Sequence, residues 1–273
     1  MHSADLVILR DQRRTPAHKP SKQLWMAFTL ESPLHISLEL DNIDWTATYR
    51  RDSTIVAPYG KWSPYHETMV TSNEEAEVNL AEKKSKKVAW FVSNCNAKNN
   101  RLEYARNLSH YIEVDIYGRC GTKTCKKSPS GECVDMLAQD YKFYLAFENS
   151  NCGDYITEKF WLTALQHTVV PVVMGARVEQ YTAVAPPHSF IHVDSFSGPQ
   201  DLAQYLIKLD SDDALYNEYF RWRTMGEFID TKFFCRVCAM LHYNLIMQHD
   251  HDQQLGKVND LHEWWKYDGV CKN

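Results

Sequence analysis

The chain has 273 residues, of which 44% are apolar and 24% charged, and its net charge is −5. This composition predicts a folded protein with room for one large domain or two smaller ones. Nothing in the charge favours a nucleic acid or an acidic membrane surface as partner. No apolar run reaches the roughly 18 to 20 residues that span a bilayer. Aromatic residues make up 12%, which suits both sugar-stacking surfaces and a large aromatic core.

The first 85 residues predict few regular elements. Strands are expected over residues 4–10 and 24–31, with a polar loop between them that contains Pro16 and Pro20. The charged stretch 74–87 predicts a solvated helix or a linker. We therefore expect a first domain over residues 1–85.

From residue 88 onward, short apolar runs alternate with amphipathic segments. Strands are expected over residues 88–94, 114–118, 141–148, 169–175 and 189–196, and helices over residues 99–111, 132–139, 157–167, 199–210 and 212–225. Pro171 indicates an edge strand or a strand start, and Pro199 a helix start. The alternation predicts a doubly wound α/β domain over residues 86–250. The last residues, 251–273, are expected to form a C-terminal tail.

The eight cysteines predict disulfide bonds in an oxidising compartment. Zinc is the alternative, because Cys120 and Cys125, like Cys235 and Cys238, have ligand-like spacing. We favour disulfides, since no further cysteine pair follows Cys238 at zinc-finger distance. Cys235 and Cys238 are too close within one predicted helix to pair with each other, so we expect them to pair elsewhere. The sequon at Asn107 also suits a lumenal protein.

Two polar segments follow predicted strands, FVSNCNAKNNR after 88–93 and FENSNCGDYITEK after 141–148. Ligands of open α/β sheets bind beyond the carboxyl ends of the strands. Each segment also leads into a helix start, where free N–H groups favour an anion. Asp154 or Thr157 is expected to cap the second helix.

Arg101 and Lys159 lie at or near these helix starts, which is the unfavourable end for a cation. A diphosphate bound between them explains both placements, and Glu158 would then accept hydrogen bonds from sugar hydroxyls. The alternative is that all three are exposed helix residues. Their occurrence at two adjacent strand ends favours the site. No GxGxxG or P-loop motif occurs, which excludes a standard dinucleotide enzyme and a P-loop NTPase.

The segment FYLAFENSNCGDYITEKFWLTALQHTVVPVVMG (143–175) resembles the signature of the α1,3-fucosyltransferases, the inverting glycosyltransferases of family 10. The similarity covers nearly the whole chain, through residues 24–37, 48–60, 89–108, 114–121, 190–206 and 234–242. Thr163 and the His167-Thr168 pair depart from the family pattern, and we expect them to change packing more than activity. The cysteines resemble the branch that acts on the innermost GlcNAc of N-glycans, at Cys95, Cys120, Cys133 and Cys152.

The resemblance implies an α/β fold of GT-B type, with two Rossmann-like domains facing across a cleft. Residues 1–85 would belong to the acceptor-side domain, truncated at its start, and residues 86–250 would bind GDP-fucose. The family carries a cytoplasmic tail, a membrane anchor and a stem before this region. The full-length form is therefore expected to be a type II protein of the Golgi membrane, with its catalytic part in the Golgi lumen.

The resemblance also implies roles for single residues. Arg101 and Lys159 would bind the diphosphate, and Asn149, Tyr155 and Glu158 would line the nucleotide-sugar pocket. Glu31, in the ESP motif, would be the general base that takes the acceptor proton. Inversion in one step needs no covalent nucleophile.

No obligatory metal is expected, although stimulation by Mn²⁺ is compatible with the family. The acidic run Asp210-Ser211-Asp212-Asp213 is expected to cap a helix and not to bind a metal. His35 is a weak candidate for a second base, and His249 and His251 are expected to be solvated. The cluster Arg50-Arg51-Asp52 is either a structural ion pair or a donor contact.

The expected activity is transfer of L-fucose from GDP-fucose to O3 of GlcNAc, with core N-glycans as acceptor and no nucleic-acid partner. One alternative is a Lewis-type or protein-directed fucosyltransferase. A second alternative is a truncated member that binds nucleotide sugar or glycan without turnover. Retention of the donor residues and of Glu31 favours the enzyme, whereas the absent opening segment favours the non-catalytic reading.

Overall fold

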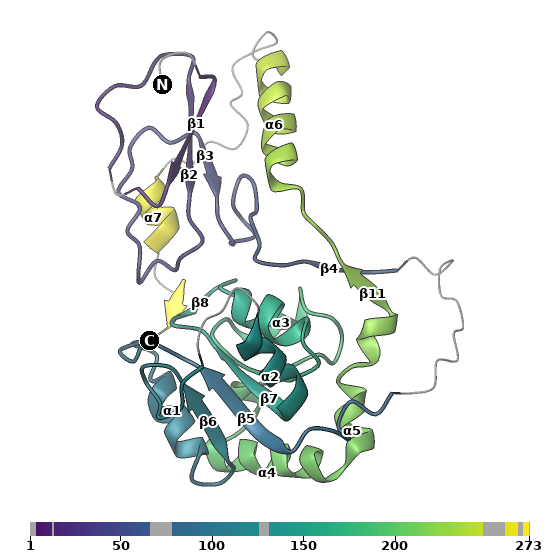
Figure 1. The fold of residues 1–273 in the computed structure, drawn as a ribbon. Coiled ribbons are helices and arrows are strands. Elements are labelled where there is room, and N and C mark those ends of the chain that lie inside the picture. The colour runs from purple at the N-terminus through teal and green to yellow at the C-terminus, as the bar shows by residue number, and fades with distance from the viewer. Residues whose placement is uncertain are drawn as a thin grey trace. The chain divides into compact units, whose positions relative to one another are not determined.

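The structure is a computed structural model that describes residues 4–12, 14–65, 78–125, 131–247, 260–266 and 270–272. The chain divides into two compact units (Figure 1). Unit 1 comprises residues 1–59, 152–155 and 230–272, and unit 2 comprises residues 60–151 and 156–229. His249 and His251 lie outside the described residues, as does part of the charged stretch 74–87.

Unit 2 is built on a parallel sheet with the strand order β10-β9-β7-β5-β6. Its strands are β5 (Lys86–Phe91), β6 (Val114–Tyr117), β7 (Tyr141–Phe147), β9 (Val170–Met174) and β10 (Ile191–His192). When the five strands are numbered by their order along the chain, their order across the sheet is 2-1-3-4-5. The direction of winding therefore reverses between β5 and β7. The expected doubly wound α/β domain is confirmed.

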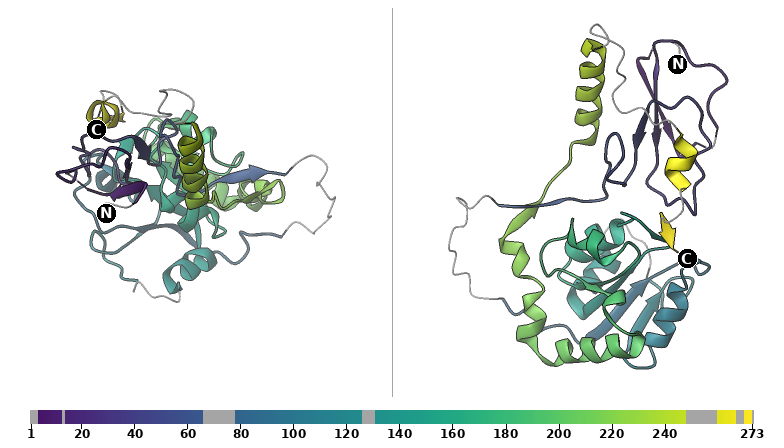
Figure 2. Two further views of the ribbon diagram at one scale, coloured as in Figure 1. Left: turned by 90° about the horizontal axis from the view of Figure 1, so that it is seen from above. Right: turned by 180° about the vertical axis from the view of Figure 1, so that it is seen from behind.

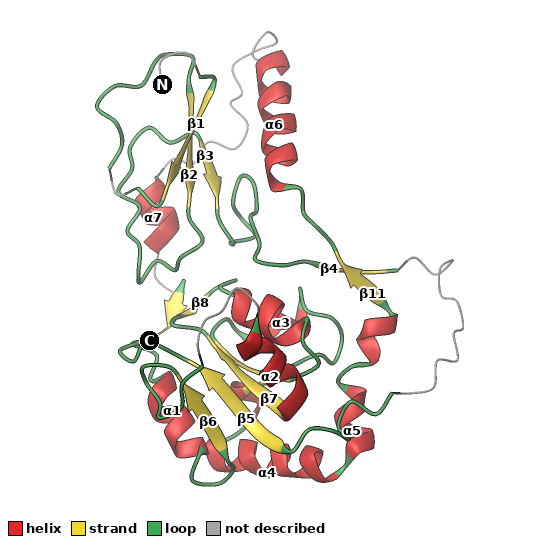
Figure 3. Cartoon of the chain, viewed as in Figure 1, coloured by secondary structure: helices red, strands yellow, loops and turns green. Residues whose placement is uncertain are grey.

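Helices cover both faces of this sheet, as Figure 3 shows. The helices of unit 2 are α1 (Arg101–Leu108), α2 (Glu132–Asp140), the π-helix η2 (Lys159–Leu165), α3 (Val178–Thr182), α4 (Pro199–Ser211) and α5 (Asp213–Glu218). Large apolar side chains of β5, β7 and β9 pack against α1, α4 and α5 in one core. Helix η2 lies against β7 and β9, and helix α2 lies against β7. The strands therefore need apolar residues on both faces, and β7 is buried along its whole length.

Several predicted elements of unit 2 are shorter than expected or differ in kind. The strand expected over 189–196 is β10 followed by the 3₁₀ turn η3 (Val193–Ser195), and the helix expected over 212–225 is α5 followed by the 3₁₀ turn η4 (Arg221–Thr224). Pro171 is the second residue of an interior strand, so the edge position is wrong and the strand start is correct. Pro199 begins α4 as predicted.

Unit 1 is built on a smaller parallel sheet with the order β1-β2-β3, formed by β1 (Leu6–Arg10), β2 (Leu24–Phe28) and β3 (Trp45–Ala47). One face packs against Leu261 and Trp265 of α7 (Leu261–Lys266). The opposite face packs against Val237 of α6 (Phe233–Met247). Both upright views show α6 beside this sheet (Figure 1; Figure 2). The sheet is thus completed by residues more than 180 positions away in the sequence.

The unit boundaries differ from the expected division after residue 85. Unit 1 ends its first segment at Tyr59, because β4 (Trp62–Pro64) pairs with β11 (Gly226–Phe228) within unit 2. Unit 1 also takes residues 230–272, which the sequence had assigned partly to the second domain and partly to a tail. The reason is packing, since α6 and α7 cover the faces of the small sheet.

Disulfides join six of the eight cysteines, all of which lie within the described residues. The pairs are Cys95–Cys120, Cys125–Cys133 and Cys152–Cys271. Because Cys120 and Cys125 are both paired, the disulfide interpretation is confirmed for them over a zinc site. Cys235 and Cys238 are exposed free thiols, so the expected pairing of these two elsewhere is wrong within the described chain. None of the helices in the described ranges combines the length and apolar character of a bilayer-crossing segment.

Candidate functional site

The carboxyl ends of β5 and β7 are neighbours in the sheet of unit 2, at the point where the winding reverses. Such switch points are where open α/β sheets bind ligands. The segments that leave these two strand ends carry Arg101, Asn149, Glu158 and Lys159, all within unit 2. The fold therefore brings four of the predicted site residues to one edge of one sheet.

Glu148 is the first residue after β7, and sequence reasoning did not single it out. Its side chain is fully buried. Its Oε1 accepts the Thr157 backbone N–H at 2.7 Å, and its Oε2 accepts the Thr157 hydroxyl at 2.9 Å. The available signal was a charged residue directly after the run 143–147, which has no charged residue, because a carboxylate that is buried needs partners.

Lys159 is the residue that both carboxylates at this edge of the sheet bind. Its Nζ donates to the Thr157 hydroxyl at 2.8 Å and forms ion pairs with Glu148 and Glu158, each at 3.1 Å. Burial alone would lower the pKa of Lys159, but the carboxylates of Glu148 and Glu158 outweigh it and raise that pKa above its usual value. The ammonium is thus charged at neutral pH, while 21% of the side chain remains exposed.

Glu158 differs from Glu148 in its access to solvent, with 47% of its side chain exposed. Partial burial would raise the pKa of Glu158, but the ion pair with Lys159 lowers it below its usual value. This carboxylate is therefore ionised at neutral pH and can accept hydrogen bonds from a ligand's hydroxyl groups.

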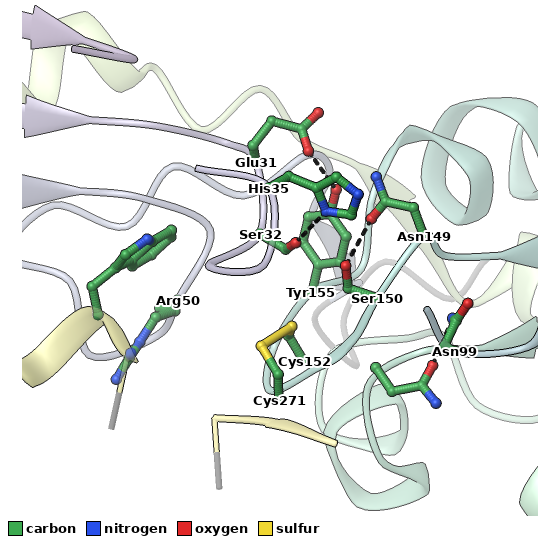
Figure 4. The surroundings of a disulfide bond; sticks show 12 residues. Glu31, Ser32, His35, Arg50, Asn99, Asn149, Ser150, Cys152, Tyr155 and Cys271 are labelled. Atoms are coloured by element: carbon green, nitrogen blue, oxygen red, sulfur yellow. Dashed lines mark hydrogen bonds between the residues drawn. A yellow bond between two sulfur atoms is a disulfide. The ribbon is translucent and has the colours of Figure 1, made fainter. Parts of the chain in front are cut away.

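Arg101 and Asn149 are the other two predicted residues at this edge of the sheet. The Arg101 guanidinium is buried and donates to the main-chain carbonyls of Phe147 at 2.7 Å and Asn94 at 3.0 Å. Arg101 therefore ties together the segments that follow β5 and β7. Asn149 is half-buried, and its Oδ1 accepts the Ser150 hydroxyl at 3.2 Å (Figure 4).

Glu31 and Tyr155 come together in unit 1 (Figure 4). The Tyr155 hydroxyl donates to Glu31 Oε2 at 3.3 Å. Tyr155 is buried against the ring of Tyr49, whereas Glu31 is exposed. His35 is paired with the Ser32 hydroxyl at 3.0 Å. The carboxylate of Glu31 is thus oriented by a buried neighbour and is exposed to a second partner.

The cluster Arg50-Arg51-Asp52 forms ion pairs, as the structural interpretation predicted, and a donor contact stays a prediction. Arg50 binds Asp52 at 2.5 Å and lies over the Trp264 ring at 4.2 Å. Arg51 binds Asp154 at 2.9 Å. Asp154 is therefore engaged by Arg51, and the expectation that it caps the helix after residue 157 is wrong.

The other predicted cap, Thr157, acts only weakly. Its hydroxyl lies 3.5 Å from the Lys159 backbone N–H and is used mainly by Glu148 and the Lys159 ammonium. The acidic run near residue 212 behaves as predicted, since the Asp212 carboxylate accepts the Leu215 N–H and caps α5. In the described part of the chain, no three His, Cys, Asp or Glu side chains are grouped as metal ligands.

Comparisons with known proteins show the family of the chain. The C-terminal part of glycosyltransferase family 10 (fucosyltransferase) matches residues 81–264, and the N-terminal part of the fucosyltransferases matches residues 1–60. The chain is 53% identical to glycoprotein 3-alpha-L-fucosyltransferase A of Drosophila melanogaster, over 98% of its own length and 53% of the relative's. It is 44% identical to 3-galactosyl-N-acetylglucosaminide 4-alpha-L-fucosyltransferase FUT3 of Bos taurus, over 83% of its length and 61% of the relative's. It thus spans about half to two thirds of these curated relatives.

A solved structure shares the fold. A crystal structure of alpha1,3-fucosyltransferase with GDP-fucose covers 92% of the chain with a TM-score of 0.60 at 19% identity. The doubly wound sheet of unit 2 and the fold shared with this structure make the chain an α/β protein of GT-B type, as the family resemblance implied. The chain belongs to glycosyltransferase family 10, the fucosyltransferases.

Proposed function

We propose that this chain transfers L-fucose from GDP-fucose to O3 of GlcNAc with inversion, and that its acceptor is the innermost GlcNAc of N-glycans. The observation that carries the proposal is the charged switch point of unit 2, where Lys159 is held by Glu148 and Glu158. The acceptor assignment is supported by the 53% identity to a relative named as a glycoprotein 3-alpha-L-fucosyltransferase.

The donor side of the reaction is assigned mainly to unit 2. The Lys159 ammonium compensates the diphosphate charge, and the buried Arg101 guanidinium adds positive charge to the same edge. Glu158 and Asn149 hydrogen-bond the sugar or ribose hydroxyls. As the bond from the anomeric carbon to GDP breaks, preorganised cations stabilise the negative charge that develops on the leaving group.

The acceptor proton is assigned to Glu31 in unit 1. As O3 of GlcNAc attacks the anomeric carbon, Glu31 takes the hydroxyl proton and GDP departs with the electrons of the broken bond. The new C–O bond forms on the face opposite GDP, so the configuration inverts in one displacement. Tyr155 orients the carboxylate through its hydroxyl.

We propose no obligatory metal and assign the contacts with the diphosphate to Lys159 and Arg101. Turnover should therefore persist in EDTA, and stimulation by Mn²⁺ would be an addition to the same chemistry. The disulfides suit an oxidising compartment, and family membership suits the secretory pathway. We place the enzyme in the Golgi lumen, with the full-length form anchored as a type II membrane protein.

The test is calorimetry with GDP and GDP-fucose, followed by turnover on a core N-glycopeptide and on a lactosamine acceptor. We expect donor binding, with turnover on the glycopeptide. Lys159→Ala should weaken GDP binding by roughly 10- to 100-fold, since a hydrogen bond to a charged group contributes about 1.5 to 3 kcal/mol. Lys208→Ala, which removes an exposed lysine of α4, is the matched control.

The other outcomes separate the alternatives. Fucose transfer to lactosamine alone would identify a Lewis-type enzyme. Donor binding without turnover on any acceptor would favour a binding protein that does not catalyse. Failure of the chain to bind GDP would overturn the proposed function.

A further inference from the structure

Glu148 is a carboxylate in a place where a carboxylate is costly. It is fully buried at the end of β7, whose residues are all buried. An unpaired charge in such a place would be strongly unfavourable, so a buried carboxylate requires hydrogen bonds and a counter-charge. Burial raises the pKa of Glu148, and Lys159 and the Thr157 N–H act against that rise.

The three donors to Glu148 all come from the start of the segment that carries the donor-side charge. Thr157 supplies its backbone N–H and its hydroxyl, and Lys159 supplies its ammonium at 3.1 Å. The same Thr157 hydroxyl also accepts from Lys159 Nζ at 2.8 Å. One carboxylate thus fixes both the backbone at Thr157 and the end of the Lys159 side chain.

The surroundings of Glu148 are shaped to hold it. Gly175 has a φ of +155°, and a Cβ there would lie 2.8 Å from Glu148 Cγ, so only glycine leaves room for this side chain. Tyr181 lies on the same side, because its hydroxyl is 3.6 Å from that same Cβ position. Burial raises the pKa of Tyr181 well above its usual value, and the Glu148 charge adds to the effect.

We propose that Glu148 is a positioning residue for donor binding, which acts only through Lys159. It holds the ammonium and the chain at Thr157 in the arrangement that receives a nucleoside diphosphate. Since Glu148 has no exposed surface, it does not touch the ligand itself. This inference rests on the proposed function, because it assumes that unit 2 binds GDP.

The test is a double-mutant cycle on GDP binding, measured by calorimetry with GDP alone. Glu148→Gln keeps the size of the side chain and an acceptor for Thr157 but removes the charge that faces Lys159. We expect roughly tenfold weaker GDP binding than in the unaltered chain, and less than about a twofold change when Lys159 is already methionine. Glu103→Gln, at an exposed carboxylate of α1, is the control and should change nothing.

A second readout separates positioning from mere stability. The charged or titratable groups that interact with Glu148 are Lys159, Glu158, Tyr144 and Tyr181, and Arg101 lies beside Tyr144 and donates to the Phe147 carbonyl. Because Glu148 raises the pKa of Lys159, its removal should lower that pKa. GDP affinity should then begin to fall at a lower pH in Glu148→Gln than in the unaltered chain. A change in stability alone would not move this profile.

The outcomes are decisive in each case. Unchanged GDP affinity in Glu148→Gln, or an equal loss in the Lys159→Met background, would overturn the inference. If Glu148→Gln does not fold, Thr157→Val probes the same contacts, since it removes the shared hydroxyl with little change in shape. Normal GDP binding by Thr157→Val would then overturn it. If the unaltered chain does not bind GDP, the proposed function fails first and the inference falls with it.

Discussion

The two units each contain a parallel sheet, but the segments that form and cover the sheet are arranged differently along the chain. The sheet of unit 2 forms from strands that follow one another along the chain, with helices between them. Unit 1 collects its sheet from the first 59 residues but covers both faces with helices from residues 230–272. The Cys152–Cys271 disulfide and the contact of Arg50 with Trp264 fasten these distant segments together. The sheet of unit 1 is therefore completed by long-range connections, whereas the five-stranded sheet of unit 2 forms from strands that are close in the sequence.

The two units also differ in the surroundings of one carboxylate each, Glu148 in unit 2 and Glu31 in unit 1. Glu148 in unit 2 is buried and accepts three donors, so it is suited to holding other groups in place. Glu31 in unit 1 is exposed and accepts one hydrogen bond, from Tyr155, so it is suited to exchanging a proton. The comparison predicts that variants of the two units fail in different ways.

The largest effect is expected from Glu31→Gln. The amide cannot take the acceptor proton, and general-base catalysis contributes typically 10²- to 10⁴-fold, so kcat should fall by about that factor. GDP affinity should stay within about twofold, because the residue lies in unit 1 and is assigned to the acceptor proton alone. Turnover kinetics and GDP calorimetry measure the two quantities, and near-normal kcat would refute the assignment of the base.

A second effect separates the stabilities of the units. Replacing both Cys152 and Cys271 by serine removes a disulfide bond between residues 119 positions apart. We expect a loss of about 3 to 5 kcal/mol of unfolding free energy, concentrated in unit 1. The reason is that a disulfide between residues far apart in the sequence removes more conformational entropy from the unfolded chain than a short-range one does. Hydrogen exchange resolves the two units, and amides of β1 to β3 should exchange faster while those of β5 and β7 change little.

The matched control for this experiment is the pair Cys125 and Cys133, separated by only 8 residues within unit 2. Its removal should cost about 2 kcal/mol by the same loop-entropy argument. Equal losses for the two pairs, or a loss spread evenly over both units, would contradict the contrast drawn between them.

A smaller effect concerns a buried cation of unit 2. Burial lowers the pKa of Lys84 from 10.5 to about 8, and its Nζ donates to the carbonyls of Ala138 and Tyr141. Above pH 8 the unfolded chain keeps the proton that the folded chain releases, so the unfolding free energy should rise with pH. We expect a rise of about 1 to 2 kcal/mol between about pH 8 and 9.5, measured by urea unfolding.

Lys84→Met should abolish that rise, whereas Lys83→Met, at the exposed neighbouring lysine, should keep it. If both variants retain the rise, it belongs to other groups. If the unaltered chain loses stability over this range, the sign of the Lys84 contribution is wrong.

The smallest effect is expected at the surface of unit 1. Arg51 and Asp154 pair at 2.9 Å, but the Arg51 side chain is 52% exposed. Exposed ion pairs contribute about 0.2 to 1 kcal/mol, so Arg51→Ala should cost less than about 1 kcal/mol and should matter least at high salt. Thermal unfolding at low and high salt tests this, and a larger loss would mean that the pair fixes the segment carrying Tyr155.

The sequence alone determined the architecture of unit 2 and the edge at which we propose its site. Apolar runs with polar ends are local features, and the ends of neighbouring parallel strands meet at one edge. Arg101, Glu158 and Lys159 were predicted in this way, and the family motif added Asn149, Tyr155 and Glu31. The motif also correctly placed the chain among the fucosyltransferases.

Only the tertiary structure decided which distant segments complete each unit and which partners each charge takes. Three features depend on which groups the folded chain brings close together. They are the packing of helices from residues 230–272 on the first sheet, the pairing of Cys152 with Cys271, and the burial of Glu148 against Lys159. The physical reason is that hydrophobic patterns fix local elements, whereas disulfide partners and buried ion pairs are selected by distance in space.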